Sequence, residues 1–258
     1  MKVSIITTCY NRKGTIGDTI QSVLSQSYPD IEYIVIDGAS QDGTMNIVSK
    51  YKDKIDIIVS EPDNGMYEAF NKGIKAATGD IIGLLHSDDL FFNPNTVEHV
   101  VDEFRKTDAD LIYGNGVYIT NHGYPKVKRV YPATTHKKYY LYFGWIPLHT
   151  TIYVKRELFK KYGLYDTNYS IASDYEISLR WFTNPDIKKH FLDRYLVKMR
   201  MGGKSTSPAL QKKKSTEDFK IIRKYKLWWY ITLSFKIGRK IPQYIMPYLV
   251  RSRYDSSY

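Results

Sequence analysis

Ile81-Ile82-Gly83-Leu84-Leu85-His86-Ser87-Asp88-Asp89 is the stretch that decides the fold. Its first five residues are mostly apolar, as in a short buried β-strand, and they lead directly into two adjacent carboxylates. Charge at the end of a buried strand lies at the carboxyl edge of the sheet, where open α/β sheets bind their ligands. Because two neighbouring carboxylates repel each other, the pattern favours a cation beside them. A divalent metal with a phosphorylated ligand is the natural candidate.

Three strand–helix units precede this stretch. The apolar runs do not alternate with polar residues, and the connections are short, which predicts a parallel sheet covered by helices on both faces. After Gly114 the rhythm changes to a predicted hairpin, an aromatic irregular stretch and further short elements. We therefore expect one α/β domain over 1–205, with halves 1–114 and 115–205. The predicted strands are 2–8, 31–36, 55–59, 81–85, 111–113, 151–154 and 191–201, and the predicted helices are 15–26, 42–52, 66–77, 95–106, 156–162 and 174–182.

The net charge of +11 belongs mostly to the C-terminal part, where residues 204–258 hold 13 Lys or Arg against 3 Asp or Glu. Basic residues mixed with aromatic ones such as Trp228 and Trp229 favour an anionic membrane surface. No nucleic-acid recognition motif is present, so we expect no nucleic-acid partner. We interpret 206–258 as a basic amphipathic helical tail that associates with membrane; a helix that packs on the domain is the alternative.

Targeting and redox signals are few. The chain starts at Met1 and enters a predicted strand at once, and no run of 18 or more apolar residues exists. We expect neither a signal peptide nor a transmembrane helix. The single cysteine, Cys9, excludes an internal disulfide, and we expect it to be a small buried residue.

Four acidic residues follow predicted parallel strands: Asp37, Asp63, Asp88 and Asp89. If the sheet is correct, their side chains gather at one edge. A single Asp in such a place often caps a helix or makes a turn, and for Asp37 and Asp63 this alternative stays open. The adjacent pair favours function, because a cap needs only one carboxylate.

Five segments together resemble the family 2 glycosyltransferases, which are inverting enzymes with the GT-A fold. Within that family, the segments most resemble non-processive transferases of bacterial surface-polysaccharide assembly, including the colanic-acid type. Gly79–Asp89 resembles the DXD-type element, and Ser173-Asp174 the acidic motif that supplies the base. The remaining segments are Val3–Asn11, Val35–Thr44 and Asp63–Gly73.

The resemblance implies a role for each matching residue. Asp174 is the catalytic base, and Asp89 contacts Mg²⁺ or Mn²⁺ bound to the diphosphate. The half 1–114 binds the nucleotide-sugar, and the half 115–205 faces the acceptor. The residues implied in nucleotide-sugar binding are Thr8, Tyr10, Asn11, Asp37, Asp63, Asn71, Lys72 and Asp88, and those implied on the acceptor side are His149, Arg180 and Trp181.

Three positions depart from the family pattern. Gly38 replaces a second carboxylate that faces the base in many relatives, so the resemblance does not imply uracil. Ser87 replaces the first Asp of the DXD element, which leaves the metal contact mainly to Asp89. Ile177 stands where processive relatives have Gln, which favours transfer of a single sugar.

Several residues keep a structural alternative. His149 is equally explained as a structural histidine, Trp181 as a core residue and Arg180 as a surface cation. Asp174, beside Ser173, has the alternative of a helix N-cap. The orientation of His86 beside the pair is not evident from sequence, so it is not assigned as a ligand. Residues 202–205 either close over the diphosphate or form a glycine-rich hinge.

The sequence therefore predicts a metal-dependent inverting sugar transferase that uses a nucleoside-diphosphate sugar. The expected acceptor is a glycan or lipid-linked oligosaccharide, and the expected location is the cytoplasmic side of a bacterial membrane. A nucleotidyltransferase is one alternative, but it needs a glycine-rich basic loop after the first strand, and residues 9–14 lack one. A catalytically inactive binding module is the non-enzymatic alternative.

Overall fold

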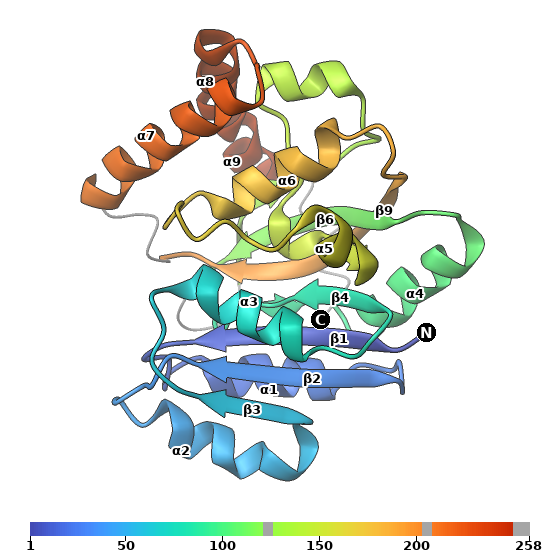
Figure 1. The fold of residues 1–258 in the computed structure, drawn as a ribbon, viewed down its shortest axis with the longest axis vertical. Helices are drawn as coiled ribbons and strands as arrows, with labels where there is room; N and C mark the ends of the chain where they lie inside the picture. Colours follow the sequence, from blue (N-terminus) through green and yellow to red (C-terminus); the bar gives the residue numbers. More distant parts are fainter. Residues whose placement is uncertain (121–125, 203–207, 250–258) are drawn as a thin grey trace.

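A computed structural model of the chain describes residues 1–120, 126–202 and 208–249. In this part of the chain, nine strands form a single sheet that is the centre of the molecule (Figure 1). The strands are β1 (Val3–Cys9), β2 (Ile31–Asp37), β3 (Ile57–Ser60), β4 (Ile81–Leu84), β5 (Leu90–Phe91), β6 (Leu111–Ile119), β7 (Val127–Tyr131), β8 (Tyr153–Lys155) and β9 (Lys189–Arg200).

The strand order is β3-β2-β1-β4-β8-β6-β9-β5, with β7 paired to β6. β1 to β4 are mutually parallel, as the strand–helix rhythm predicts. β8 is antiparallel to both β4 and β6, while β9 is parallel to β6. The predicted α/β class is confirmed, with a parallel N-terminal half and a mixed second half.

Helices cover both faces of the sheet, because neighbouring residues of the buried strands point to opposite sides. Ile6 of β1 belongs to the core beneath α3, and Ile5 to the core beneath α1 and α4. The α-helices before the C-terminal part are α1 (Ile16–Leu24), α2 (Thr44–Val48), α3 (Met66–Ala76), α4 (Thr96–Lys106), α5 (Glu157–Tyr162) and α6 (Ser173–Thr183), and the 3₁₀ helices are η1 (Ser49–Lys54), η2 (Lys138–Phe143) and η3 (His149–Thr151).

Two predicted elements differ in extent from the observed ones. The helix expected over 42–52 is α only as far as Val48 and continues as the 3₁₀ helix η1. The strand expected at 111–113 runs on to Ile119 through two glycines. A Cβ on Gly114 would lie 2.7 Å from Leu196, and one on Gly116 2.7 Å from Leu148. These glycines therefore allow close packing within the sheet and do not end the strand.

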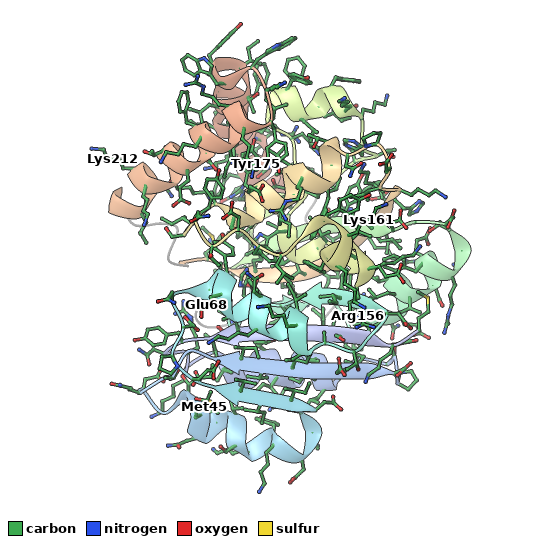
Figure 2. The ribbon with its side chains drawn as sticks, in the orientation of Figure 1. Met45, Glu68, Arg156, Lys161, Tyr175 and Lys212 are labelled. Atoms are coloured by element: carbon green, nitrogen blue, oxygen red, sulfur yellow. The ribbon has the colours of Figure 1, made fainter. Side chains whose placement is uncertain are left out.

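The basic C-terminal part forms α7 (Pro208–Lys224), α8 (Trp229–Gly238) and α9 (Lys240–Leu249). α7 packs into the body, since Ile221 and Ile222 are fully buried. Buried Glu217 accepts hydrogen bonds from the backbone N–H groups of residues 170, 171 and 172, at 2.9–3.1 Å. The packed-helix alternative therefore describes α7, while Lys212 on its outer face points away from the body (Figure 2).

Within the described ranges, every helix is too short or too polar to cross a bilayer.

Candidate active site

The carboxyl ends of β1, β2 and β4 meet at one edge of the sheet. Cys9 pairs with Asp37 at the ends of β1 and β2, and the backbone N–H of Leu85 donates to the carbonyl of Ile6 at 3.0 Å. Buried Thr8, near the end of β1, and half-buried Asp88, after β4, therefore belong to strands that end side by side. This edge gathers the side chains that the sequence singles out on the first half of the chain.

Asp89 is the most unusual carboxylate at this edge, because its side chain is only 1% exposed. Its Oδ1 accepts a hydrogen bond from the backbone N–H of Arg200 at 3.3 Å, and its Oδ2 is buried without a hydrogen-bond partner. Burial, followed by the neighbouring charge of Asp88, raises its pKa well above the ordinary value. A buried carboxylate oxygen without a donor fits a bound cation, so the residues present suit a metal contact.

Asp37 is also buried, but both of its carboxylate oxygens accept hydrogen bonds inside the protein. Ser40 donates to it through its hydroxyl at 2.5 Å and its backbone N–H at 3.0 Å, and the Ser60 hydroxyl donates at 2.7 Å. Asp37 thus joins the ends of β2 and β3 and shapes the turn after β2. Its geometry supports the turn role that the sequence left open.

Asp63 lies against Gly38, the position where many relatives have a second carboxylate. A Cβ on Gly38 would stand 2.6 Å from Oδ2 of Asp63 and 3.4 Å from the ring of Tyr10. The Asp63 carboxylate therefore occupies space next to Gly38 that a side chain would otherwise need. Tyr10 is half exposed and forms the other wall of this corner.

The amides and the lysine predicted to face the nucleotide have partners within the chain. Asn11, at φ 53°, accepts from the N–H of Gln41 at 3.0 Å, which joins the loops after β1 and β2. Asn71 exchanges hydrogen bonds of 2.9 and 3.0 Å with the backbone of Tyr165. Lys72 donates to the carbonyl of Pro62 at 3.0 Å and so supports the turn that holds Asp63.

Asp174 sits in the first turn of α6 and is held from two sides. The Tyr67 hydroxyl of α3 shares its one proton between the carbonyl of Ile171 at 2.8 Å and Oδ1 of Asp174 at 3.0 Å, and His149 Nδ1 lies 3.2 Å from Oδ2. Burial raises the pKa of this carboxyl, but His149 and the more distant Lys214 and Lys236 outweigh it and lower the pKa overall. Asp174 is therefore ionised at neutral pH, as a proton acceptor must be.

The two halves of the chain meet at a pair of histidines. Nε2 of His149 lies 2.6 Å from Nε2 of His86, which follows β4 and precedes Asp88. The structure thus brings Asp174 and His149 together and connects both with the segment of Asp88 and Asp89. The sequence left the orientation of His86 undefined, and no pattern around it indicates this contact.

Arg180 and Trp181 lie deeper in the protein. Arg180 forms an ion pair with fully buried Glu176 and donates to the carbonyls of Tyr162 and Leu164 at 3.0 and 2.8 Å. It is therefore no surface cation. Trp181 is 2% exposed and packs edge-on against Phe159. Both contacts suit a core role for this pair.

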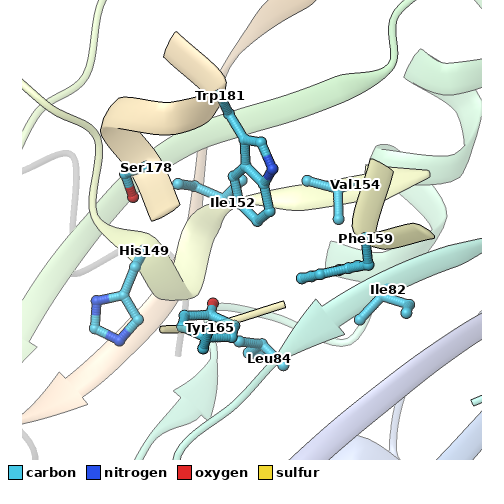
Figure 3. A pocket seen from close by; sticks show the side chains of 9 residues that line it. All are labelled: Ile82, Leu84, His149, Ile152, Val154, Phe159, Tyr165, Ser178 and Trp181. Carbon is cyan, nitrogen blue, oxygen red and sulfur yellow. The ribbon is translucent and has the colours of Figure 1, made fainter. Parts of the chain in front are cut away.

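An internal pocket lies beside His149 and is mostly apolar (Figure 3). Trp181 and Ser178 point into it from α6, and none of the predicted donor-side residues lines it. Its lining suits packing around the histidine and does not suit a charged nucleotide. The lining residues are Ile82, Leu84, His149, Ile152, Val154, Phe159, Tyr165, Ser178 and Trp181.

Three contacts at the site have no signal in the sequence. Tyr67 has the apolar spacing of a core helix residue, Glu217 lies in a strongly basic stretch, and Arg200 is one cation among many. Arg200 pairs with Asp18 at 2.5 Å, beside Asp89.

Of the segment 202–205, Gly202 has a left-handed φ of 101°, and the rest lies outside the described residues. Among those residues, no group of three or more His, Cys, Asp or Glu side chains could hold a metal ion.

The architecture is that of the GT-A glycosyltransferases. The chain superposes on S. aureus TarS 1-349 with a TM-score of 0.67 and 20% identity, over 86% of this chain and 64% of that one. The mannosyltransferase PcManGT from Pyrobaculum calidifontis, solved with GDP-Man and Mn²⁺, gives a TM-score of 0.64 at 18% identity, over 86% and 63% of the two chains. At these identities the likeness establishes the fold alone.

The family follows from sequence comparison. Residues 4–163 match the model of Glycosyl transferase family 2, so the chain belongs to that family and is a glycosyltransferase. It is 31% identical to an uncharacterized glycosyltransferase of Rickettsia prowazekii, over 84% of this chain and 69% of that one. It is 26% identical to a PGL/p-HBAD biosynthesis glycosyltransferase of Mycobacterium bovis, over 73% of each. The chain spans about two thirds of the length of its first relatives.

Proposed function

We propose that this protein transfers one sugar from a nucleoside-diphosphate sugar to a glycan acceptor, with inversion at the anomeric carbon. The main support is Asp89, a buried carboxylate with an unbonded oxygen at the sheet edge where α/β proteins bind ligands. Family membership and solved GT-A neighbours bound to UDP-GlcNAc or GDP-Man support a nucleotide-sugar donor.

In this proposal the donor lies along the edge formed by β1, β2 and β4. Thr8, Tyr10 and Asp63 are the side chains best placed for the nucleoside, and Asp88 for the ribose. Asn11, Asp37, Asn71 and Lys72 shape the surrounding loops through the hydrogen bonds described above. In this proposal these side chains hold the loops around the donor in place and make few direct contacts with the donor.

Asp89 would hold Mg²⁺ or Mn²⁺, completed by diphosphate oxygens and water. When bound, the metal neutralises charge on the nucleoside diphosphate as it leaves. PcManGT, solved with Mn²⁺, supports a divalent ion for this fold. Because burial and Asp88 raise the pKa of Asp89, metal binding is expected to compete with protonation of this carboxylate.

Asp174 is the proposed general base. It accepts the proton of the acceptor hydroxyl while the acceptor oxygen bonds to C1 and the C1–O bond to the diphosphate breaks. Its ionised state and its partial exposure of 24% suit this step, which typically contributes ~10²–10⁴-fold. Ile177 in α6 supports release after a single sugar, as the resemblance implies.

The nucleotidyltransferase and the inactive binding module differ from this proposal in their products. We expect transfer from one of UDP-, GDP-, dTDP- or CDP-sugars in the presence of Mn²⁺, and release of the matching nucleoside diphosphate. Mass spectrometry of the products, with thermal shifts against the four free diphosphates, measures this. Pyrophosphate release from a nucleoside triphosphate would favour the nucleotidyltransferase, and binding without turnover the inactive module.

The acceptor is proposed to be lipid-linked, because the C-terminal helices expose aromatic residues. Of the fourteen large hydrophobic side chains exposed in the described residues, nine lie between 228 and 248. Phe143 of η2 packs edge-on against Phe235 and extends this surface. Exposed Arg223 and Lys226 lie just before Trp228, and basic residues beside aromatic ones suit an anionic bilayer surface. This supports a peripheral location at the cytoplasmic side of the membrane.

Substituting Trp229, Tyr230 and Phe235 by Ser is expected to abolish sedimentation with phosphatidylglycerol-containing vesicles while leaving folding intact. All three side chains are about half exposed, so the substitutions remove little core packing. Arg223→Gln with Lys226→Gln is expected to weaken sedimentation by ~1 kcal/mol per charge. The charge-matched control, Lys50→Gln with Lys52→Gln, lies on η1 at the far end of the molecule (Figure 1). Equal sedimentation of all variants would contradict the membrane proposal.

A further inference from the structure

A chain of close polar contacts runs from Asp174 through His149 to His86. His149 lies on η3, in the second half of the chain, and His86 on the loop after β4, in the first. Their rings meet edge to face, with centroids 4.9 Å apart and planes at 74°. Nε2 of each ring points at the other, at 2.6 Å.

The proton positions in this chain follow from chemistry. An ionised carboxylate only accepts hydrogen bonds, so we infer that His149 carries its proton on Nδ1, the nitrogen that lies 3.2 Å from Oδ2 of Asp174. Neutral imidazole then has a bare Nε2, and the contact of 2.6 Å requires Nε2–H on His86. Burial is the largest cause that lowers the pKa of both rings, that of His86 to about 3, so both are neutral at neutral pH.

The surroundings of His149 and Asp174 show which of these two side chains can accept a proton from the acceptor hydroxyl. Both nitrogens of His149 are occupied, and its side chain is 16% exposed against 24% for Asp174. His149 therefore has no free nitrogen to accept a proton from an acceptor hydroxyl. Asp174 has two oxygens with further lone pairs, so it remains the group that can accept that proton.

We propose that His149 is a positioning residue for Asp174, and that His86 links it to the segment of Asp88 and Asp89. This inference rests on the proposed function, in which Asp174 is the base. Tyr67 of α3 contacts the other carboxylate oxygen through a proton that it shares with the carbonyl of Ile171, so both halves of the protein contact the base. The base then reaches its position only when the donor segment is in place.

The chain moves no proton in this proposal. The acceptor O–H bond breaks, its proton goes to Asp174, and the electron pair of the C1–O bond leaves with the diphosphate. His149 keeps its Nδ1 proton throughout and holds the carboxylate oxygen towards the acceptor. A misplaced base costs on the order of 10²-fold, which sets the scale of the effect.

His149→Ala is expected to lower kcat about 10- to 100-fold with little change in donor KM. It also removes the group that lowers the pKa of Asp174, so the acid limb of the kcat–pH profile moves to higher pH. A purely structural role would not move that limb. The other titratable groups that face Asp174 are Tyr67 on α3, Tyr118 on β6, Tyr131 on β7, Tyr165 before α6, Lys214 on α7 and Lys236 on α8.

Two near-isosteric variants separate the two contacts. The amide of Asn reaches the place of Nδ1, so His149→Asn keeps a donor to Asp174. The amide of Gln reaches the place of Nε2, so His149→Gln keeps only the contact with His86. The Asn variant is expected to retain more kcat than the Gln variant, and the reverse order would contradict the proposal.

A spectroscopic test on the wild-type protein needs no activity. Long-range ¹H–¹⁵N spectra of histidine-labelled protein are expected to show Nδ1–H for His149 and Nε2–H for His86. A proton on Nε2 of His149, or wild-type kcat and an unshifted acid limb in His149→Ala, would overturn the inference. Absence of transfer in the wild type would instead refute the proposed function, and the proton positions would still test the chain.

Discussion

Asp174→Asn is expected to lower transfer by ~10²–10⁴-fold, because an amide cannot accept the proton of the acceptor hydroxyl. The substitution keeps the size of the side chain and can still accept from Tyr67, which donates to Oδ1 at 3.0 Å. Binding of the nucleoside diphosphate should survive, since Asp174 belongs to the acceptor half. Single-turnover transfer and the nucleotide-induced thermal shift measure the two properties separately.

The matched control is Asp186→Asn, an exposed carboxylate shortly after α6 that makes no contact with the site. It should transfer at the wild-type rate. Wild-type turnover in Asp174→Asn would remove Asp174 from the mechanism. Loss of nucleotide binding together with transfer would mean that the substitution disturbs the whole site.

Local sequence signals predicted the first half of the fold well. Short apolar strands followed by helices define β1 to β4, and these strands are parallel as expected. The second half was harder, because β5 has two residues and exists only through its pairing with β9, far along the chain. Glycines in β6 looked like a strand end, although they serve close contacts with Leu196 and Leu148.

In the candidate site, too, local sequence predicts some residues, while others depend on contacts between distant segments. Asp89 and Asp174 stand in motifs that local sequence displays, and the structure gives both an environment suited to chemistry. Asp37 stands in an equally clear motif, yet Ser40 and Ser60 satisfy it, and only tertiary contacts distinguish the two cases. His86, Tyr67 and Glu217 act through contacts between distant segments, for which residue type and spacing give no signal.

Glu217 shows a contact between the C-terminal part and the domain that composition does not indicate. The excess of basic residues in 204–258 suggested a separable tail, but Glu217 binds the loop that precedes α6 and thereby Asp174. Buried Asp218 pairs with Lys236 at 2.8 Å and fixes α8 against α7. Glu217 therefore connects this segment with the loop before α6, and deletion of 206–258 is expected to disturb the site itself.

Asp89→Asn is expected to have opposite effects on stability and on activity. Without metal, burial and Asp88 raise the pKa of Asp89, so the folded state keeps the proton to a higher pH than the unfolded chain does. This group's contribution to stability is therefore complete below the unfolded pKa of about 3.9 and is lost as pH rises towards the folded pKa. Asn cannot ionise, so the variant does not lose this stability as the pH rises, and it should melt at a higher temperature than wild type in EDTA at neutral pH.

With Mn²⁺ and a nucleoside diphosphate the order should reverse. Ligand at 100 times its Kd stabilises the wild type by ~2.7 kcal/mol, whereas the variant lacks the buried oxygen that would contact the metal. Transfer should fall at least about 100-fold, which corresponds to ~2.7 kcal/mol of lost transition-state stabilisation. Asp53→Asn, an exposed carboxylate on η1, is the control and should leave both properties unchanged. An equal Mn²⁺-dependent shift in wild type and Asp89→Asn would show that Asp89 does not hold the metal, because metal binding would then not depend on this carboxylate.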